Sequence, residues 1–367
     1  MSVVFYISGH GFGHASRSAL VVNALGELAP ELPIGLRTTV PEWFLRANVH
    51  RPVNIITGAT DTGVVQPDSL SIDEAETARR AREFYAEFDT RVEREAAILR
   101  EHRGTLVVGD IPPLAFAAAS AAGLPSVAIS NFTWDWIYGG LPGFDSAAPG
   151  VREQIAAANA QATLTLRLPF AGGFDGMRPL EDVPLVARRA TVTRHDARAR
   201  LGLPSTQRLV LATFGGHGGS VPLASAADDP RQLVVATEYE VPRDAPRHPN
   251  LRVVTRADMQ RAGVTYTDLL AACDAVVTKL GYGIVSECLA NGVPLLYTLR
   301  GRFIEQEVFM REMPAVMRSR LIDREDLVAG RWGDALDALL AQQAPASTLR
   351  ADGADVIARR ILARLQR

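Results

Sequence analysis

The stretch VVFYISGHGFGHASR (residues 3–17) places an apolar run directly before a glycine-rich loop and the first turn of a helical pattern. A strand that ends in a glycine loop and continues into a helix is how a βαβ unit of a parallel sheet begins. The glycine spacing differs from the dinucleotide-binding fingerprint, because the third glycine would fall at position 14, which is His14. The Gly-Lys-Ser/Thr ending of a phosphate-gripping loop is also missing. We therefore expect neither a nicotinamide-dependent dehydrogenase nor a P-loop kinase.

The same alternation of short apolar runs and helical stretches continues along the chain. The charged stretch 71–103 carries Glu/Arg pairs at helical spacing and predicts one or two solvent-exposed helices. A chain of 367 residues is longer than one hydrophobic core usually serves. The pattern predicts an α/β protein with two Rossmann-like domains, whose parallel sheets face each other across a cleft. The apolar runs are 34–40, 53–56, 105–110, 125–130, 208–216, 251–255, 274–279 and 293–298.

Glycine and proline accumulate between Leu168 and Pro204, where we expect the linker between the domains. The prediction is an N-terminal Rossmann-like domain over residues 1–185 and a C-terminal Rossmann-like domain over residues 186–345. Residues 346–367 are predicted to form an amphipathic helix, for which the pattern indicates no packing partner.

Composition indicates which binding partners and which cellular compartment to expect. The chain has 39 basic and 41 acidic residues, so bulk charge does not favour a nucleic-acid partner. Cys273 and Cys288 lie in apolar segments and form neither a metal-ligand pattern nor a disulfide framework, which suits a reducing compartment. The N-terminus lacks the pattern of a signal peptide, and no apolar run approaches the ~20 residues of a membrane span. We expect a cytoplasmic protein without integral membrane contact, and the sequence leaves the oligomeric state open.

The histidines of the first glycine loop indicate proton transfer. His14 stands where the loop meets the helix, at the sheet edge that faces the ligand crevice of a doubly wound fold. Because imidazole exchanges protons near neutral pH, we interpret His14 as a general base. Asp110, at the end of its strand, is the alternative base, and His10 is interpreted as structural. The residues expected to let a substrate approach the backbone closely are Gly11, Phe12 and Gly13.

Two further loops, both in the second half of the chain, are suited to an anion. Each follows a predicted strand and opens a helix, whose positive end would face the cleft. Glu287 lies in the second turn of the later helix, where a carboxylate is placed to accept both hydroxyls of a ribose. The residues expected to hold a diphosphate are Gly215, Gly216, His217, Gly218, Gly219 and Ser220 in the first loop and Lys279, Gly281, Tyr282 and Gly283 in the second.

These loops, in this order, resemble those of nucleotide-sugar glycosyltransferases with the GT-B fold. The frame from Gly281 to Pro294 and the loops GGHGGS (215–220) and GHGFGH (9–14) are similar to the MurG-like N-acetylglucosaminyltransferase that makes the lipid precursor of peptidoglycan. YISGHGFGHASR (6–17) and SNFTWDWIY (130–138) resemble the glycosyltransferase-like module at the N-terminus of plant L-arabinokinases. Together these similarities extend over nearly the whole chain.

The resemblance implies that residues 1–185 form the acceptor domain, in which Gly11, Phe12 and Gly13 contact the acceptor, and that residues 186–345 form the donor domain. It also implies roles for other residues. Glu287 would hold the donor ribose, and the 215–220 and 281–283 loops would hold the diphosphate. Glu305 and Gln306 fall where the family places side chains that touch the donor sugar, but the family has two glutamines, so Glu305 is a departure. The acceptor-side segment also differs from the family pattern and argues against the lipid-linked acceptor; it consists of Asn131, Phe132, Thr133 and Trp134.

Two absences shape the expected chemistry. No Asp-x-Asp occurs in the chain, so we expect no metal and no cofactor beyond a nucleotide-diphosphate sugar, taken to be UDP-linked. Retaining members of the fold carry a second glutamate eight positions before the ribose-binding one, and that position is Lys279 here. The prediction is therefore an inverting glycosyltransferase that moves a hexose or N-acetylhexosamine to a small, soluble acceptor. The alternatives are a UDP-sugar 2-epimerase and a non-catalytic sugar-nucleotide-binding or regulatory module.

Overall fold

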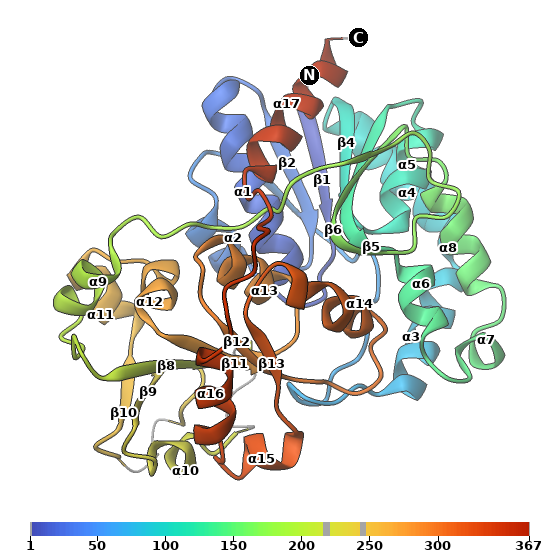
Figure 1. Ribbon diagram of the computed structural model, residues 1–367. Helices are drawn as coiled ribbons and strands as arrows, with labels where there is room; N and C mark the ends of the chain where they lie inside the picture. The colour runs from blue at the N-terminus through green and yellow to red at the C-terminus, as the bar shows by residue number, and fades with distance from the viewer. Residues whose placement is uncertain (1, 216–220, 243–246, 367) are drawn as a thin grey trace.

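The structure is a computed structural model that describes residues 2–215, 221–242 and 247–366. Over these residues the chain forms two sheets, one of seven strands and one of six, in which neighbouring strands pair in parallel. The sheets lie in two lobes, each covered by helices (Figure 1). The expected α/β class with two parallel-sheet domains is confirmed.

The first sheet is built from β1 (Ser2–Ile7), β2 (Ile34–Thr38), β3 (Asn54–Thr57), β4 (Gly104–Asp110), β5 (Ser126–Phe132), β6 (Leu164–Gly172) and β7 (Leu180–Asp182). In space the strands follow the order β3-β2-β1-β4-β5-β6-β7. Strands β1, β4 and β5 are buried over most of their length. Helices cover both faces of a parallel sheet, which is why these strands read as continuous apolar runs and not as alternating ones.

The second sheet repeats this arrangement. Its strands are β8 (Arg208–Thr213), β9 (Gln232–Thr237), β10 (Leu251–Val254), β11 (Ala275–Lys279), β12 (Leu295–Thr298) and β13 (Ser319–Leu321). The order in space is β10-β9-β8-β11-β12-β13. In both sheets, therefore, the first strand of the domain is third in the order, and the fourth strand pairs beside it.

The helices of the first half are α1 (Gly13–Leu28), α2 (Glu42–Asn48), α3 (Glu74–Ala86), α4 (Phe88–Glu101), α5 (Pro113–Ala121), α6 (Trp134–Gly139), α7 (Phe144–Ala147) and α8 (Val151–Asn159). The charged stretch 71–103 forms α3 and α4, but these helices are not exposed all round. Ala81, Phe84 and Leu99 are buried, because one face of each helix packs on the apolar cluster beneath the sheet. Glutamate–arginine pairs occupy the exposed face of α3.

The helices of the second half are α9 (Arg194–Arg200), α10 (Leu223–Ala227), α11 (Arg256–Ala262), α12 (Tyr266–Ala272), α13 (Tyr282–Ala290), α14 (Glu305–Glu312), the 3₁₀ helix η1 (Met313–Ala315), α15 (Arg324–Val328), α16 (Gly333–Leu340) and α17 (Gly353–Leu365). The C-terminal helix α17 returns to the first domain, where it packs against α1 (Figure 1). In the described part of the chain, no helix combines the length and the apolar character that crossing a bilayer requires.

The chain crosses between the lobes twice, and the two crossings meet. The backbone N–H of Leu185 donates to the carbonyl of Arg350 at 3.0 Å, and Val186 forms an isolated bridge with Asp352. A few residues later the backbone N–H of Ala190 donates to the side chain of Asn291 in the second lobe, at 2.8 Å. On this ground we propose the boundary between the two domains at residues 185 and 186.

A loop of the first domain also reaches the second. Residues 58–73 connect β3 to α3, and Leu70 within this loop is buried in the apolar cluster of the second sheet. The carbonyl of Leu70 accepts a hydrogen bond from Arg324 at 3.4 Å. The segment therefore lies against both domains, along one side of the space between them.

Candidate active site

The candidate site lies where the strand order of each sheet reverses. In the first sheet β1 and β4 are neighbours, with Ile7 opposite Asp110. The chain continues from β1 to β2 on one side of this pair and from β4 to β5 on the other side. In the second sheet β8 and β11 have the same relationship. Open parallel sheets bind ligands in the crevice at such points, beyond the carboxyl ends of the strands. The loops that the sequence singles out follow β1, β8 and β11, so they occupy this position in both domains.

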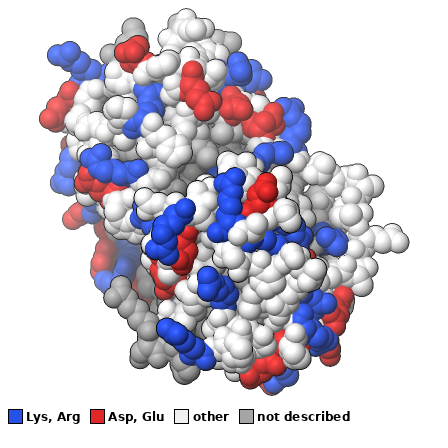
Figure 2. Space-filling model, turned by 90° about the vertical axis from the view of Figure 1, so that its left-hand side faces the viewer, with Lys and Arg blue, Asp and Glu red and all other residues white. Residues whose placement is uncertain are grey.

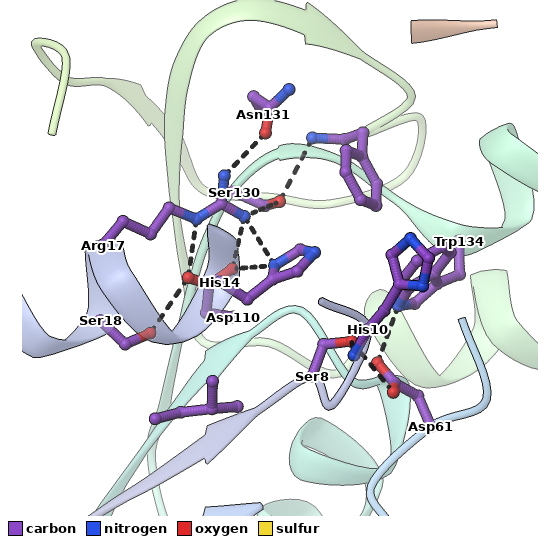
Figure 3. Close-up of polar contacts among 12 residues, drawn as sticks. Ser8, His10, His14, Arg17, Ser18, Asp61, Asp110, Ser130, Asn131 and Trp134 are labelled. Carbon is purple, nitrogen blue, oxygen red and sulfur yellow. Dashed lines mark hydrogen bonds and ion pairs between the residues drawn. The ribbon is translucent and has the colours of Figure 1, made fainter. Parts of the chain in front are cut away.

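His14 and Asp110 form a hydrogen-bonded pair at the reversal point of the first sheet. The Nδ1 atom of His14 lies 2.8 Å from Oδ1 of Asp110, and both side chains are buried. Figure 3 shows the opposite edge of the imidazole ring turned away from Asp110, toward His10 and Trp134. Nη2 of Arg17 also lies 3.0 Å from Nδ1 of His14. Because an ionised carboxylate only accepts hydrogen bonds, we assign the Nδ1 proton to the bond with Asp110, which leaves Nε2 as the acceptor nitrogen of the neutral ring.

Asp110 is held ionised by its surroundings. Arg17 donates to it twice, from Nε to Oδ2 at 2.7 Å and from Nη2 to Oδ1 at 2.5 Å, and Ser18 donates to Oδ2 at 3.1 Å. Burial alone would raise the pKa of Asp110, but the Arg17 guanidinium and His14 outweigh it and lower the pKa to about 2. The two candidate bases therefore have different roles. His14 keeps one ring nitrogen free to accept a proton, whereas the carboxylate of Asp110 orients the imidazole ring of His14 through its hydrogen bond to Nδ1.

The glycine loop of the first domain leaves its backbone open. Gly11 has a φ of +65°, in the left-handed region that glycine adopts without strain. A Cβ atom at Gly11 or Gly13 would meet nothing within 4 Å, so neighbouring atoms do not require glycine at these positions. Gly11, Phe12 and Gly13 are all exposed. The loop thus offers bare main chain beside His14, as the acceptor prediction needs.

The segment predicted to contact the acceptor is buried. Asn131, Phe132, Thr133 and Trp134 have exposed fractions of 0, 4, 1 and 0%. They end β5 and begin α6, and they pack behind His14, whose ring lies 5.5 Å from Phe132 and 6.1 Å from Trp134. The segment therefore forms the wall that supports His14, and its contact with an acceptor stays a prediction.

One of these wall residues contacts the donor side of the cleft. The amide of Asn131 donates from Nδ2 to Oε1 of Glu305 at 2.7 Å, and its Oδ1 accepts from Nη1 of Arg17 at 2.8 Å. Glu305 is buried and lies 3.8 Å from Arg300. Its neighbour Gln306 uses its amide on the loop before α14, accepting from the backbone N–H of Arg300 at 2.7 Å and donating to the carbonyls of residues 300, 301 and 303. Gln306 therefore stabilises that loop, and contacts of Glu305 and Gln306 with a donor sugar stay predictions.

The described glycines that are expected to hold a diphosphate follow the ends of β8 and β11. Gly215 follows β8 with a φ of +85°. Residues Gly216, His217, Gly218, Gly219 and Ser220 lie outside the described residues. After β11, a Cβ atom at Gly281 or Gly283 would meet nothing within 4 Å, which leaves the start of α13 open to a ligand. Tyr282 between them is buried, with the guanidinium of Arg17 located 5.1 Å from its ring centroid.

Lys279 ends β11 and is the one lysine of the chain; every other basic side chain is an arginine. Burial lowers the pKa of Lys279 to about 8, and the charge of Arg300 acts in the same direction. Its ammonium group is therefore largely charged at neutral pH. A cation at this strand end, beside the N-terminus of α13, suits the negative charge that a diphosphate leaving group develops.

Glu287 is buried in the second turn of α13 and pairs with a residue of the interdomain linker. Arg188 donates from Nε to Oε1 of Glu287 at 2.6 Å, and its Nη2 lies 2.6 Å from the same oxygen. Burial raises the pKa of Glu287, and Arg188 opposes this shift. The expected ribose-binding carboxylate thus already has a partner, although a carboxylate offers about four acceptor positions.

The sequence reasoning missed three charged residues around the site. Arg17 follows His14 by three positions in α1, and residues at this spacing share one face of a helix. Asp61 lies four residues beyond β3, at the same sheet edge as Asp110, and strand-end position is the signal that points to it. Arg188 lies in the linker and has no pattern of its own. Figure 2 shows basic and acidic side chains interspersed on the face it displays, as the near-neutral composition suggests.

Known structures share this architecture. CalG4, the calicheamicin glycosyltransferase, aligns with a TM-score of 0.66 and 16% identity over 100% of this chain and 99% of its own. The Phytolacca americana UGT2, complexed with UDP-2-fluoro-glucose and pterostilbene, aligns with a TM-score of 0.60 and 11% identity over 100% and 94%. The glycosyltransferase VinC, in complex with dTDP, aligns with a TM-score of 0.56 and 18% identity over 100% and 95%. The chain has the GT-B fold of these glycosyltransferases.

A curated sequence relative is the L-arabinokinase of Arabidopsis thaliana. It is 30% identical over 335 residues, which make up 89% of this chain and 31% of the relative. The chain thus spans about a third of that protein's length. No family model matches the chain.

Proposed function

We propose that this protein is an inverting glycosyltransferase that transfers a hexose or N-acetylhexosamine from a nucleotide-diphosphate sugar, UDP-linked, to a small acceptor. The observation that carries the proposal is the 2.8 Å hydrogen bond between His14 and Asp110 at the ligand edge of the first sheet, beside an open glycine loop. The GT-B neighbours with nucleotide ligands support the donor class. Both cysteines are free and buried, which supports a cytoplasmic protein.

The mechanism follows from which atoms are free. The acceptor hydroxyl gives its proton to Nε2 of His14 while its oxygen attacks the anomeric carbon from the face opposite the diphosphate. The bond between that carbon and the diphosphate oxygen breaks, and its electron pair leaves with the diphosphate. Asp110 stabilises the imidazolium that forms, because its carboxylate already accepts from Nδ1. Lys279 and the N-terminus of α13 stabilise the leaving diphosphate, and the transfer uses no metal.

The test is a set of transfer assays with UDP-, dTDP- and GDP-linked sugars, in which nucleoside diphosphate release and the glycosylated product are both measured. His14→Ala is expected to lower turnover by ~10²-fold or more, the usual contribution of a general base. Nucleotide affinity should stay within about twofold, because the donor binds chiefly to the other domain. Circular dichroism confirms that the variant folds.

Two results would overturn the proposal. If no nucleotide sugar binds, the site is not a donor site, and if His14→Ala transfers sugar at the wild-type rate, the residue is not the base. An epimerised sugar formed without acceptor would support a 2-epimerase instead. A chelator added in excess should leave donor affinity unchanged, and a loss of affinity would contradict the metal-free mechanism.

A further inference from the structure

A pocket of about 410 Å³ opens beside the glycine loop of the first domain. Its volume falls in the range of about 300–1,000 Å³ that ligand pockets occupy. The polar residues that line it come from the glycine loop, the end of β2, the 58–73 loop and α3: His10, Thr39, Asp61, Thr62, Gln66 and Arg80. Only two of the lining residues, Val64 and Val65, have apolar side chains. Most ligand pockets are lined predominantly by apolar and aromatic side chains, so this wall is unusually polar.

Asp61 is the most informative residue of the wall. Its Oδ1 accepts from Oγ of Ser8 at 3.0 Å, and its Oδ2 accepts from Nε1 of Trp134 at 2.9 Å (Figure 3). Among the described residues it forms no ion pair. Burial raises the pKa of Asp61, although the hydrogen bond from Ser8 opposes the shift. Of the four acceptor positions of a carboxylate, two are used and two remain.

Gln66 contributes a polar group that lacks a partner. Its Nε2 atom is buried and has no hydrogen-bond partner among the described residues. A buried donor without an acceptor costs free energy, as does a buried carboxylate without enough donors. A ligand rich in hydroxyl groups supplies both kinds of partner, because each hydroxyl donates and accepts.

The pocket lies within one side-chain layer of the proposed base. His10, which lines the pocket, packs edge-on against Trp134 with ring centroids 5.5 Å apart. The same indole ring lies 6.1 Å from His14 and holds Asp61 through its N–H. Asp61 and His14 thus both contact the side chain of Trp134, one through a hydrogen bond and the other through its ring. A small acceptor held by Asp61 therefore has the base close to its other end.

An exposed aromatic pair borders the same loop. Phe12 follows Gly11 of the pocket wall and is 39% exposed, and Trp43 is 53% exposed, with 5.9 Å between their ring centroids. Phe44 stacks beneath Phe12 at 4.4 Å and fixes its position. Such a pair offers an apolar surface to the carbon skeleton of a ligand whose hydroxyls enter the pocket.

We propose, building on the proposed glycosyltransferase activity, that the acceptor is a neutral polyhydroxy compound, a sugar or a sugar alcohol, whose hydroxyls are bound by Asp61 and Gln66 in this pocket. Arg80 in the wall is paired with Glu76 at 2.8 Å and therefore offers no uncompensated charge to an anionic acceptor. The polar lining disfavours a flat aromatic acceptor such as the pterostilbene bound by the Phytolacca americana enzyme. Asp61 thereby determines specificity, and His14 performs the chemistry.

The test compares acceptor classes at one fixed donor. The panel contains monosaccharides, alditols, an alkyl glycoside, pterostilbene and an alkyl amine, and transfer is followed by product mass and nucleotide release. Polyhydroxy acceptors should be used at least tenfold more efficiently than pterostilbene or the amine. The alkyl glycoside separates a free sugar from the terminal sugar of a larger molecule, and transfer to either supports the proposal.

Variants of the pocket residues then test whether the acceptor binds in this pocket. Asp61→Asn should raise the acceptor KM about tenfold or more, while donor affinity and slow donor hydrolysis stay unchanged. Gln66→Leu should shift the acceptor KM in the same direction, and it decides the matter if Asp61→Asn does not fold. The matched control is Asp135→Asn, because burial also raises the pKa of Asp135 but the residue does not line the pocket.

The acceptor class is overturned if the protein binds a donor but transfers sugar to pterostilbene or the amine in preference to polyhydroxy compounds. That result would leave the glycosyltransferase proposal standing. An unchanged acceptor KM in folded Asp61→Asn and Gln66→Leu overturns the assignment of this pocket. Failure of every nucleotide sugar to bind overturns the proposed function itself.

Discussion

Asn131 and Glu305 are joined by a hydrogen bond of 2.7 Å, although Asn131 lies in β5 of the first sheet and Glu305 begins α14, a helix from the second half of the chain that packs against β6. Both side chains are buried. Because Asn131 also accepts from Arg17, and Arg17 holds Asp110, a continuous chain of polar contacts runs from the proposed base to the donor segment. The relative position of the two domains and the orientation of the base are thus connected.

A double-mutant cycle on this pair should reveal its strength. Asn131→Ala and Glu305→Ala are expected to couple by about 1.5–3 kcal/mol in the free energy of unfolding, the range for buried hydrogen bonds to charged groups. Denaturant unfolding of the four proteins measures the coupling. The control cycle pairs Asn131→Ala with Glu307→Ala, an exposed residue of the same helix, for which we expect no coupling. Equal coupling in both cycles would show that the contact contributes nothing specific.

Arg17 should be among the most destabilising positions to change. Arg17→Met removes both donors that compensate the buried carboxylate of Asp110, and breaking one side of a buried ion pair costs about 3–5 kcal/mol. Adding Asp110→Asn to Arg17→Met should recover part of this loss, since the uncompensated charge is then absent. Arg79→Met is the control, because Arg79 pairs on the exposed face of α3, where water and salt screen the charges, so we expect little loss of stability. Similar losses for Arg17→Met and Arg79→Met in thermal or denaturant unfolding would contradict this view.

The fold could be predicted from the sequence because strand and helix periods alternate from the first residue to β12. The rule that parallel sheets bind ligands at their carboxyl edge then placed His14 and Asp110 in one region, and the structure joins them by a hydrogen bond. Side-chain burial is not encoded in a local pattern. Trp134 is fully buried, and the side chain of Gln306 bonds to the backbone of its own loop. Both facts depend on how segments far apart in the chain pack together. The role of Asp61 could not be predicted for the same reason, since its hydrogen-bond partners Ser8 and Trp134 lie 53 and 73 positions away in the sequence.

Glu287 and Arg188 allow the ribose assignment to be tested against a structural role. If Glu287 binds the donor ribose, Glu287→Ala should weaken nucleotide binding by ~1–3 kcal/mol, the contribution of hydrogen bonds to a charged group. Arg188→Ala frees the carboxylate of its partner and should leave nucleotide affinity unchanged or increase it. Calorimetric titration with nucleoside diphosphates measures both variants. If the two substitutions lower stability alike and neither alters affinity, Glu287 serves only to attach the linker to α13.

Lys279 predicts how donor binding depends on pH. Its pKa is lowered from 10.5 to about 8 by burial first and by Arg300 second, so roughly 90% of the protein carries the charge at pH 7. A diphosphate is anionic, so the charged form of Lys279 binds it more tightly. Affinity should therefore be full below about pH 7 and should fall by up to ~10-fold as the pH rises through 8, which is the charge lost from this one group. Lys279→Met should bind the donor more weakly and show no change between pH 7 and 9.

The pKa itself can be measured directly because the chain contains a single lysine. Protein labelled with ¹³Cε-lysine gives one lysine resonance, and its chemical shift, followed as a function of pH, yields the midpoint without assignment. That midpoint should lie near 8 in the free protein and should rise when a nucleoside diphosphate is bound, because the bound anion favours the charged form. Binding near pH 8 should then take up protons, which appears as a dependence of the calorimetric enthalpy on the ionisation enthalpy of the buffer. A midpoint near 10.5 that ignores the nucleotide would place Lys279 outside the donor site and leave the N-terminus of α13 as the group that stabilises the leaving diphosphate.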